Sequence, residues 1–127
     1  MANTDNILSF VASEAITEFS LVSTTTDGKV KTTEAATDRR CIGVAQRACA
    51  AGDSVEVKIS GATRVIAGAT IANSTTLVMA DSNGKVVTHQ TQGNFSIGQI
   101  LPNINQVSSS ASDQILINFT GPVNLVP

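Results

Sequence analysis

Few side chains in this sequence have the types and spacing that catalysis requires. His89 is the only histidine, and a serine or cysteine nucleophile would need it as the general base. The residues around it, Val87–Gln90, contain no nucleophile elbow and follow a predicted hairpin directly. We expect His89 to face solvent near the end of a strand, and we assign no catalytic residue. The sequence does not predict an enzyme.

Metal and cofactor sites lack ligands with suitable spacing. Cys41 and Cys49 are eight residues apart, whereas paired ligands in structural zinc sites are separated by about two to four residues. The ten carboxylates are scattered and show no calcium-loop spacing. The glycines form no phosphate-binding loop. We therefore predict neither a bound metal nor a cofactor.

Two short motifs have two interpretations each. Cys41 and Cys49 lie among Ile, Val and Ala, so we expect two small buried or half-buried thiols, with a disulfide between them as the alternative. Arg39 and Arg40 form the only pair of adjacent basic residues in the chain. Such a pair is either solvated or in contact with a partner.

The composition argues against several classes of function. Charged residues make up 14% of the 127 residues, against roughly 25% in an average soluble protein. The eight Lys and Arg form no basic run, so we expect no nucleic-acid partner. Aromatic residues make up 3%, with no Trp or Tyr to stack on bases or sugars. No apolar run is long enough to span a membrane, and Met1–Asn6 does not resemble a secretory signal.

The local patterns predict strands rather than helices. Val55–Ile59 alternates apolar and polar residues, as a half-buried strand does. Asp27–Gly28 and Asn83–Gly84 are hairpin signals, because these residues tolerate a positive φ. Further strands are predicted at Thr63–Ile66, Leu77–Met79 and Ile115–Phe119. The fold class is therefore all-β.

An internal repeat organises these elements. Residues 13–61 and 68–121 share one order of short motifs, with Gly28 and Gly84 separated by 56 residues and Ile42 and Ile97 by 55. We expect two similar hairpin-containing halves that close around one core as a small β-sandwich or barrel-like domain over residues 13–127. The second copy is longer, and Pro102–Gln106 and Ser108–Ser110 predict a surface loop there.

The first twelve residues lie outside this repeat. A polar stretch, Asn3–Asn6, precedes the apolar stretch Ile7–Val11. We expect residues 1–12 to form an extended N-terminal arm that becomes ordered against a partner, with Ile7, Leu8 and Phe10 as apolar anchors. The alternative is that Ile7–Val11 is simply the first strand of the domain.

The order of the motifs resembles a known family. Thr37–Ala45 reads TDRRCIGVA, Ala50–Gly61 reads AAGDSVEVKISG, and Arg64–Gly68 follows as RVIAG before a second Leu-Val and Gly-Lys-Val. Over roughly residues 14–121 the chain resembles the small β-rich capsid decoration (cement, or head-stabilising) proteins of tailed bacteriophages. It departs from them after Gly98, between Leu101 and Ser112.

The resemblance implies a structural protein without turnover or cofactor. It implies synthesis in the host cytoplasm, a place on the outer capsid surface of the virion, and binding to the major capsid protein as a homotrimer, with no nucleic-acid or membrane partner. The protein would stabilise contacts between capsid subunits. One alternative is another virion component, such as a head fibre base or tail ornament. A cell-surface adhesion or carbohydrate-binding module is a further alternative, and the scarcity of aromatic residues argues against it.

Overall fold

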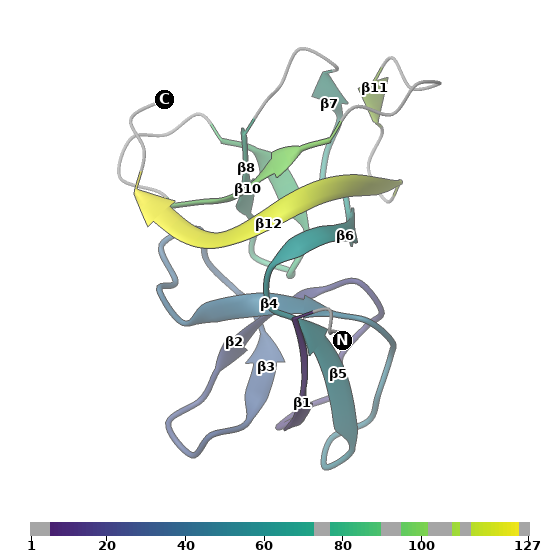
Figure 1. Cartoon of the computed structure of the whole chain (residues 1–127), viewed down its shortest axis with the longest axis vertical. Helices are drawn as coiled ribbons and strands as arrows, with labels where there is room; N and C mark the ends of the chain where they lie inside the picture. Colours follow the sequence, from purple (N-terminus) through teal and green to yellow (C-terminus); the bar gives the residue numbers. More distant parts are fainter. Residues whose placement is uncertain (1–5, 73–76, 90–94, 102–107, 110–112, 125–127) are drawn as a thin grey trace.

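The computed structural model describes residues 6–72, 77–89, 95–101, 108–109 and 113–124. Within these ranges the chain forms strands, turns and extended segments and no helix (Figure 1), so the predicted all-β fold class is confirmed. The first half contains β1 (Ile7–Val11), β2 (Leu21–Thr24), β3 (Val30–Thr32), β4 (Cys41–Ala45) and β5 (Ser54–Lys58). The second half contains β6 (Gly61–Ile66), β7 (Ile71–Ala72), β8 (Leu77–Ala80), β9 (Val86–Thr88), β10 (Phe95–Ile100), β11 (Ser108–Ser109) and β12 (Gln114–Asn124).

Two antiparallel sheets with the same strand order form the described structure. The first sheet has the order β1-β5-β4-β2-β3 and the second has the order β6-β12-β10-β8-β9, while β7 and β11 form a separate pair. In Figure 1 the first sheet occupies the lower half of the molecule and the second occupies the upper half. Each strand of the first sheet therefore has a counterpart in the second: β1 with β6, β2 with β8, β3 with β9, β4 with β10, and β5 with β12.

The counterpart strands share the details of their pairing. Leu21 lies opposite Val44 in the first sheet, and Leu77 lies opposite Gln99 in the second. Both sheets then shift register in the same place, so that Ile42 of β4 and Ile97 of β10 have no partner in β2 and β8. A shared β-bulge of this kind bends both sheets alike.

A glycine follows each bulge, because the neighbouring strand lies too close for a side chain. A Cβ on Gly43 would overlap the carbonyl oxygen of Lys58 and lie 2.6 Å from Val57 Cγ1. A Cβ on Gly98 would lie 2.7 Å from the carbonyl oxygen of Asn118. Both distances are shorter than van der Waals contact, so the close approach of the strands depends on glycine at these two positions.

Each sheet curls until its two edge strands meet. Ala12, directly after β1, forms a parallel bridge with Val30 of β3, and Ala67 forms the same bridge with Val86 of β9. In both halves the backbone N–H of the next residue donates to that valine carbonyl at 2.8 Å. Since each bridge joins opposite edges of one sheet, each half resembles a small, partly open barrel.

The buried apolar side chains form two clusters, where the sequence predicted one core. The smaller cluster lies within the first half and consists of Ala12, Ile16, Val22, Val30, Ala45, Val55 and Val57. The larger cluster fills the second half and takes in Leu21, Cys41 and Val44 from the first half. Successive residues of a strand point to opposite faces. Leu21 therefore packs toward the second half while Val22 packs inside the first, and the shared cluster joins the halves.

The tip of the β8–β9 hairpin adds a second connection between the halves. Gly84 is buried there with φ +74°, and a Cβ on it would lie 2.5 Å from Thr32 Cγ2 in the first half. Gly28, at the same place in the β2–β3 hairpin, has φ +82° and no atom within 4 Å of the equivalent point. Both hairpin turns were predicted from their glycines, but only the second tip packs against the other half.

The N-terminal arm is not confirmed. Ile7–Val11 forms β1, which pairs with β5 along its whole length, so the alternative of a first strand describes these residues. β1 and its counterpart β6 both fall at or beyond the limits of the predicted copies, 13–61 and 68–121. These two strands share no sequence motif, and only their corresponding places in the two sheets show that they belong to the repeat.

The predicted loop between Gly98 and Asp113 is partly wrong. Ser108–Ser109 forms β11, which pairs with β7, because an extended segment of the longer second copy adds backbone hydrogen bonds to β7. The rest of that prediction, Pro102–Gln106 and Ser110, lies outside the described residues.

Candidate functional site

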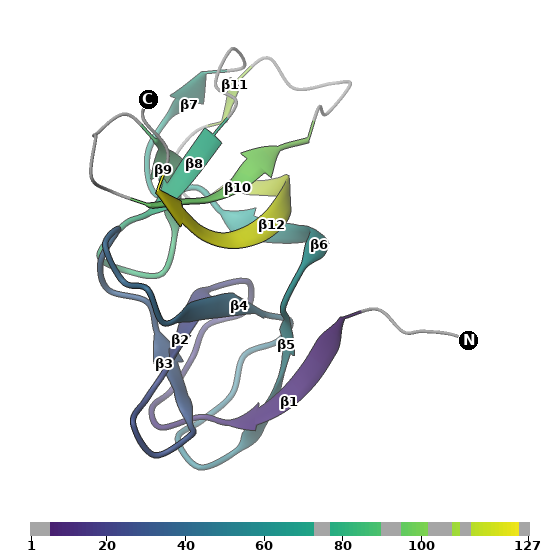
Figure 2. The same ribbon diagram turned by 60° about the vertical axis from the view of Figure 1, so that its left-hand side comes forward.

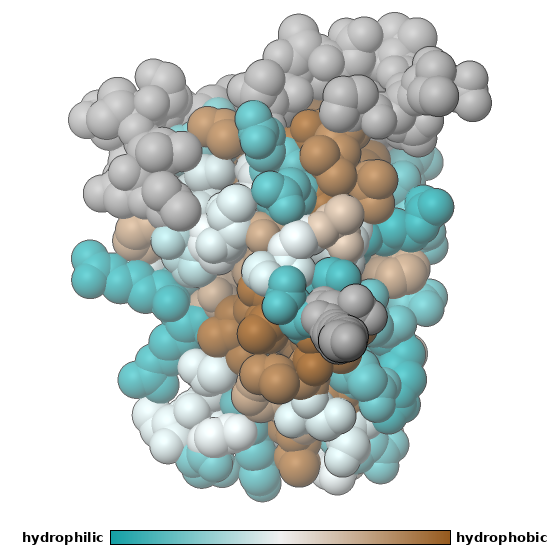
Figure 3. Space-filling model, viewed as in Figure 1, coloured by the Kyte–Doolittle hydropathy of each residue, from teal (hydrophilic) through white to brown (hydrophobic). Residues whose placement is uncertain are grey.

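Exposed apolar side chains gather on β1. In the described part of the chain, Ile7 is 42% exposed, Leu8 51% and Val11 40%, while Leu116 on β12 is 37% exposed. Figure 3 shows apolar side chains gathered over the part of the lower half where β1, β4 and β5 lie in Figure 1. The edge strand of the first sheet is therefore the first candidate for a contact surface.

β1 is apolar on both of its faces. Leu8 and Phe10 lie opposite two buried valines of β5, so their side chains share the face that points into the first half. Phe10 is half-buried and packs against the first-half cluster, whereas Leu8 is half exposed. Ile7 and Val11 lie on the outer face. Of the three predicted anchors, Ile7 and Leu8 are thus accessible, and Phe10 mainly completes the core.

The counterpart strand β6 shows how such an edge is protected. Its exposed residues are Ala62 and Arg64, and its larger apolar residues Val65 and Ile66 are buried or half-buried. A charged side chain on an edge strand discourages pairing with other chains. The sequence of β1 contains no charged residue, so this strand lacks the protection that β6 has.

A pocket beside the β2–β3 hairpin is the second candidate site. Its volume is about 280 Å³, and it is lined by Thr24, Thr25, Thr26, Lys31, Asp38 and Arg40; we call it the threonine pocket. β3, which carries Lys31, is the edge strand opposite β1 in the first sheet. Figure 2 shows β1 on one side of the lower half and the β2–β3 hairpin on the other. Four of the eight basic residues of the chain fall within residues 29–40, close to this pocket.

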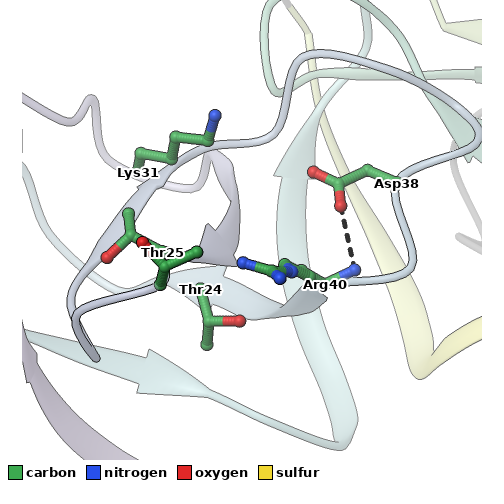
Figure 4. Close-up of a pocket in the computed structure, with 6 residues that line it drawn as sticks. Thr24, Thr25, Lys31, Asp38 and Arg40 are labelled. Carbon is green, nitrogen blue, oxygen red and sulfur yellow. Dashed lines mark hydrogen bonds between the residues drawn. The ribbon is translucent and has the colours of Figure 1, made fainter.

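The adjacent arginines Arg39 and Arg40 have different surroundings. The guanidinium of Arg39 lies over the Phe95 ring, 5.6 Å from its centroid, a cation–π contact that connects this segment to β10 of the second half. Arg40 lines the threonine pocket, and its backbone N–H donates to Asp38 Oδ1 at 2.9 Å (Figure 4). The basic pair is therefore divided between an internal contact and a surface pocket.

His89 is 7% exposed, so the prediction that it faces solvent is wrong. Its backbone N–H donates to the Leu77 carbonyl at 3.0 Å, which extends the β8–β9 pairing by one residue. The counterpart residue Thr33 bonds the Leu21 carbonyl at 2.9 Å in the same way and is also buried. Continued pairing beyond the strand therefore turns both side chains inward.

Both cysteines are free thiols, which confirms the first interpretation over a disulfide. Cys41 is buried and Cys49 is half-buried. Burial raises the pKa of the Cys41 thiol to about 11, against a smaller opposing effect of its hydrogen bond with Thr33. A thiol with so high a pKa is a poor nucleophile at neutral pH, because the thiolate is the reactive form.

No group of three or more His, Cys, Asp or Glu that could hold a metal ion occurs within the described ranges. Those ranges also contain no helix of the length and apolarity needed to cross a membrane. The candidate contact surfaces in the described part of the chain are β1 and the threonine pocket.

Comparison with known proteins identifies the family of the chain. Residues 2–103 match the phage cement protein family, a range that includes β1 and every residue of the threonine pocket. The chain belongs to the phage cement protein family. As a cement protein it is a structural component of the phage virion, associated with the capsid. No curated protein sequence matches the chain.

A solved structure shares the fold of this cement protein. It is the head fibre gp8.5 N base of bacteriophage phi29, which superposes with a TM-score of 0.69 over 92% of this chain and 96% of that chain. The two sequences are 14% identical, so the likeness concerns the fold. The fold described above is thus shared with another phage head component.

Two parts of these surfaces were missed in the sequence. Val11 belongs to the exposed face of β1, and the absence of charge along Ile7–Val11 was the signal for it. The threonines Thr24–Thr26 adjoin a predicted hairpin, but nothing local connects them with Arg40. Their convergence depends on the pairing of β2 with both β3 and β4.

Proposed function

We propose that this cement protein is a capsid decoration protein that binds the outer surface of a phage head and stabilises contacts between major capsid protein subunits. The observation that carries the proposal is the family match over residues 2–103. The protein is made in the host cytoplasm, acts on the assembled head without catalysis, and requires neither a cofactor nor nucleic acid.

The surface that supports this role best is β1. A shell contact there would bury the side chains of Ile7 and Leu8, which are 42% and 51% exposed. Fully burying such a side chain contributes about 1.5–3 kcal/mol relative to leaving it exposed. Because each side chain is already about half-buried in the isolated protein, a shell contact would add about half of that free energy. A stable interface buries about 800 Å² on each partner, so β1 must act together with neighbouring surface.

A homotrimer would multiply this modest contact. Three copies held together engage several capsid subunits at once, and the second and third contacts form at a high effective concentration. Sedimentation equilibrium of the purified protein measures the mass directly. A mass three times that of the 13.1 kDa chain is expected either in solution or for the protein released from heads.

Co-sedimentation with heads of the source phage tests the function itself. Purified protein is mixed with unexpanded and with expanded heads, the heads are pelleted, and bound copies are counted by densitometry. Saturable binding at hundreds of copies per head is the expected result. Heads so decorated should also withstand heat or low salt better than bare heads, which measures stabilisation separately from binding. Absence of binding to both forms contradicts the proposal.

Point substitutions in β1 test the contact surface. Deleting residues 2–12 would remove a paired strand and the half-buried Phe10, so a folding defect would obscure the result. Replacing Ile7 and Leu8 together by serine leaves the strand pairing intact, and we expect a loss of head binding. The matched control is Leu116→Ser, which removes an exposed apolar side chain, 37% exposed, from the other half. Equal binding by both variants would exclude β1.

The alternative function is a head fibre base, which the likeness to the phi29 head fibre N base favours. As a fibre base the protein would attach at few positions, whereas as a decoration protein it would cover the lattice. The copy number from the same experiment separates the two functions. A dozen copies or fewer per head would support the fibre base.

A further inference from the structure

The threonine pocket contains an arginine whose charge is not balanced by its own neighbours. The Arg40 guanidinium forms no ion pair with any residue in the described ranges. Its backbone N–H bonds Asp38 Oδ1, which fixes the segment without engaging the guanidinium. Figure 4 shows the Arg40 side chain pointing across the pocket toward Thr24 and Thr25. The donors of this guanidinium are therefore open to a ligand from outside the chain.

The charges around the pocket limit which anion fits. Lys31 and Arg40 contribute two positive charges and Asp38 one negative charge, which leaves one positive charge. Lys31 Nζ is also 3.8 Å from Glu34 Oε1, with side chains 40% and 64% exposed, and exposed pairs of this kind are weak and exchange readily. A singly charged group balances the one positive charge left by the lining residues, whereas a doubly charged phosphate would exceed it.

The shape of the donors favours a planar ligand. A guanidinium presents parallel N–H groups that match the two oxygens of a carboxylate. The hydroxyl groups of Thr24 and Thr26 can donate to the same carboxylate oxygens. The Thr25 hydroxyl is already bonded to Asp27 Oδ1 and to the Lys29 carbonyl. A protein side chain of Asp or Glu combines the single charge, the planar shape and a size within the volume of about 280 Å³.

The pocket belongs to the first half alone. The positions in the second half that correspond to Thr24, Thr25, Thr26 and Lys31 are Ala80, Asp81, Ser82 and Val87. The repeated fold therefore does not by itself produce the pocket, because Lys31 and two of the three threonines have no equivalent in the second half. Since β1 also lies in the first half, at the opposite edge of the same sheet, the pocket is placed to supply a second point of attachment.

We propose that the threonine pocket binds a carboxylate side chain of a capsid protein subunit, with Arg40 as the principal donor. This inference rests on the proposed function and adds the chemistry of the partner surface. β1 supplies an apolar contact at one edge of the first sheet, and the pocket supplies a charged contact at the other edge. Two contacts on opposite edges allow one copy to bridge neighbouring subunits.

Charge-matched variants in the co-sedimentation assay test the pocket. Arg40→Glu reverses the charge inside the pocket. The control, Arg64→Glu, makes the same change in net charge at an exposed residue of β6, outside the pocket. We expect Arg40→Glu to weaken head binding about tenfold or more and Arg64→Glu to leave it unchanged. Arg40→Lys, which keeps the charge but loses the planar fork, should give an intermediate loss. Thermal unfolding of each variant checks that the domain is folded.

A titration of the free protein tests the pocket without heads. The backbone N–H signals of the pocket residues Thr24 and Thr25 are followed by NMR during addition of sodium acetate and, separately, inorganic phosphate at matched ionic strength. A saturable shift with acetate that is absent in Arg40→Lys supports the proposal. A shift with phosphate alone would overturn the carboxylate assignment.

The outcomes distinguish a failure of the proposed function from a failure of the pocket proposal. If the wild-type protein does not bind heads, the proposed function fails. If it binds and Arg40→Glu and Arg64→Glu bind equally well or equally poorly, the function stands and the pocket proposal is overturned. If Arg40→Lys binds as well as the wild type, a simple point charge suffices and the carboxylate geometry is wrong.

Discussion

The carbonyl oxygen of Gly84 accepts a hydrogen bond of 2.8 Å from the backbone N–H of Leu21. This bond joins the tip of one hairpin in the second half to the first residue of β2 in the first half. Leu21 also belongs to the larger buried cluster, so a backbone bond and an apolar contact meet at one residue. The two halves are therefore fixed to each other at the tip of the β8–β9 hairpin.

Gly84→Ala should destabilise the protein much more than Gly28→Ala. Both residues have a positive φ, which costs a non-glycine residue about 1–2 kcal/mol. Only at position 84 does the added Cβ also meet Thr32 Cγ2, at 2.5 Å, which adds overpacking of about 1–3 kcal/mol. Urea unfolding of the two variants measures the difference. Equal losses would show that the second tip does not pack as described.

Gly43→Ala and Gly98→Ala should both be destabilising, with Gly43→Ala the more severe. At Gly43 the new Cβ overlaps the Lys58 carbonyl oxygen, and at Gly98 it lies 2.7 Å from the Asn118 carbonyl oxygen. A backbone oxygen cannot rotate away, so the strands must separate, and we expect losses of about 3 kcal/mol or more. Gly52→Ala is the reference, since no atom lies within 4 Å of its Cβ position and its φ of +89° alone should cost about 1–2 kcal/mol. The free energy of unfolding in urea orders the three variants.

The two thiols should react at very different rates. Cys49 is half-buried, whereas Cys41 is buried and has a pKa of about 11. In native buffer a chromogenic disulfide reagent should modify Cys49 and leave Cys41 unreacted until the protein unfolds. The Cys49→Ala variant should lose the fast reaction entirely. Two fast reactions in the wild type would disprove the burial of Cys41, and no reacting thiol in denaturant would indicate a disulfide.

Stability should decrease in alkaline solution because of Cys41. Its pKa is raised from 9.0 to about 11 in the folded protein, so the unfolded chain loses this proton first. The contribution is fully present below pH 9 and is lost as the pH rises toward 11, by about 3 kcal/mol at most. The difference in unfolding free energy between wild type and Cys41→Ala, followed from pH 8 to 11, isolates this effect. A difference independent of pH would contradict it.

Local signals in the sequence were sufficient for the hairpins and for most strands. Asp27–Gly28 and Asn83–Gly84 carry the turn geometry in their own residues, and Val55–Ile59 carries its burial in the alternation of its residues. Features that depend on distant pairing were not visible in this way. β1 needs β5 as its partner, and the burial of His89 needs the Leu77 carbonyl.

The two candidate sites differ in the same way: one has a local signal in the sequence, and the other depends on distant pairing. Ile7 and Leu8 were identified because an apolar run stands out near the start of the chain, although its form as a paired strand was not foreseen. The threonine pocket was not identified, because its walls come from three segments that only the folded sheet brings together. Arg39 and Arg40 were noticed as a pair, but only the structure shows that one is engaged by Phe95 and the other is not.

The contact between the two halves is made from one side of the repeated unit. Val44 is fully buried because the second half packs on it, but its counterpart in the second half is Gln99, which is exposed. An exposed glutamine at this position offers no apolar side chain of the kind that Val44 contributes to the shared cluster. The position that joins the first half to the second is therefore polar in the second half, so this part of the surface exposes a hydrogen-bonding side chain and not an apolar one that would favour self-association.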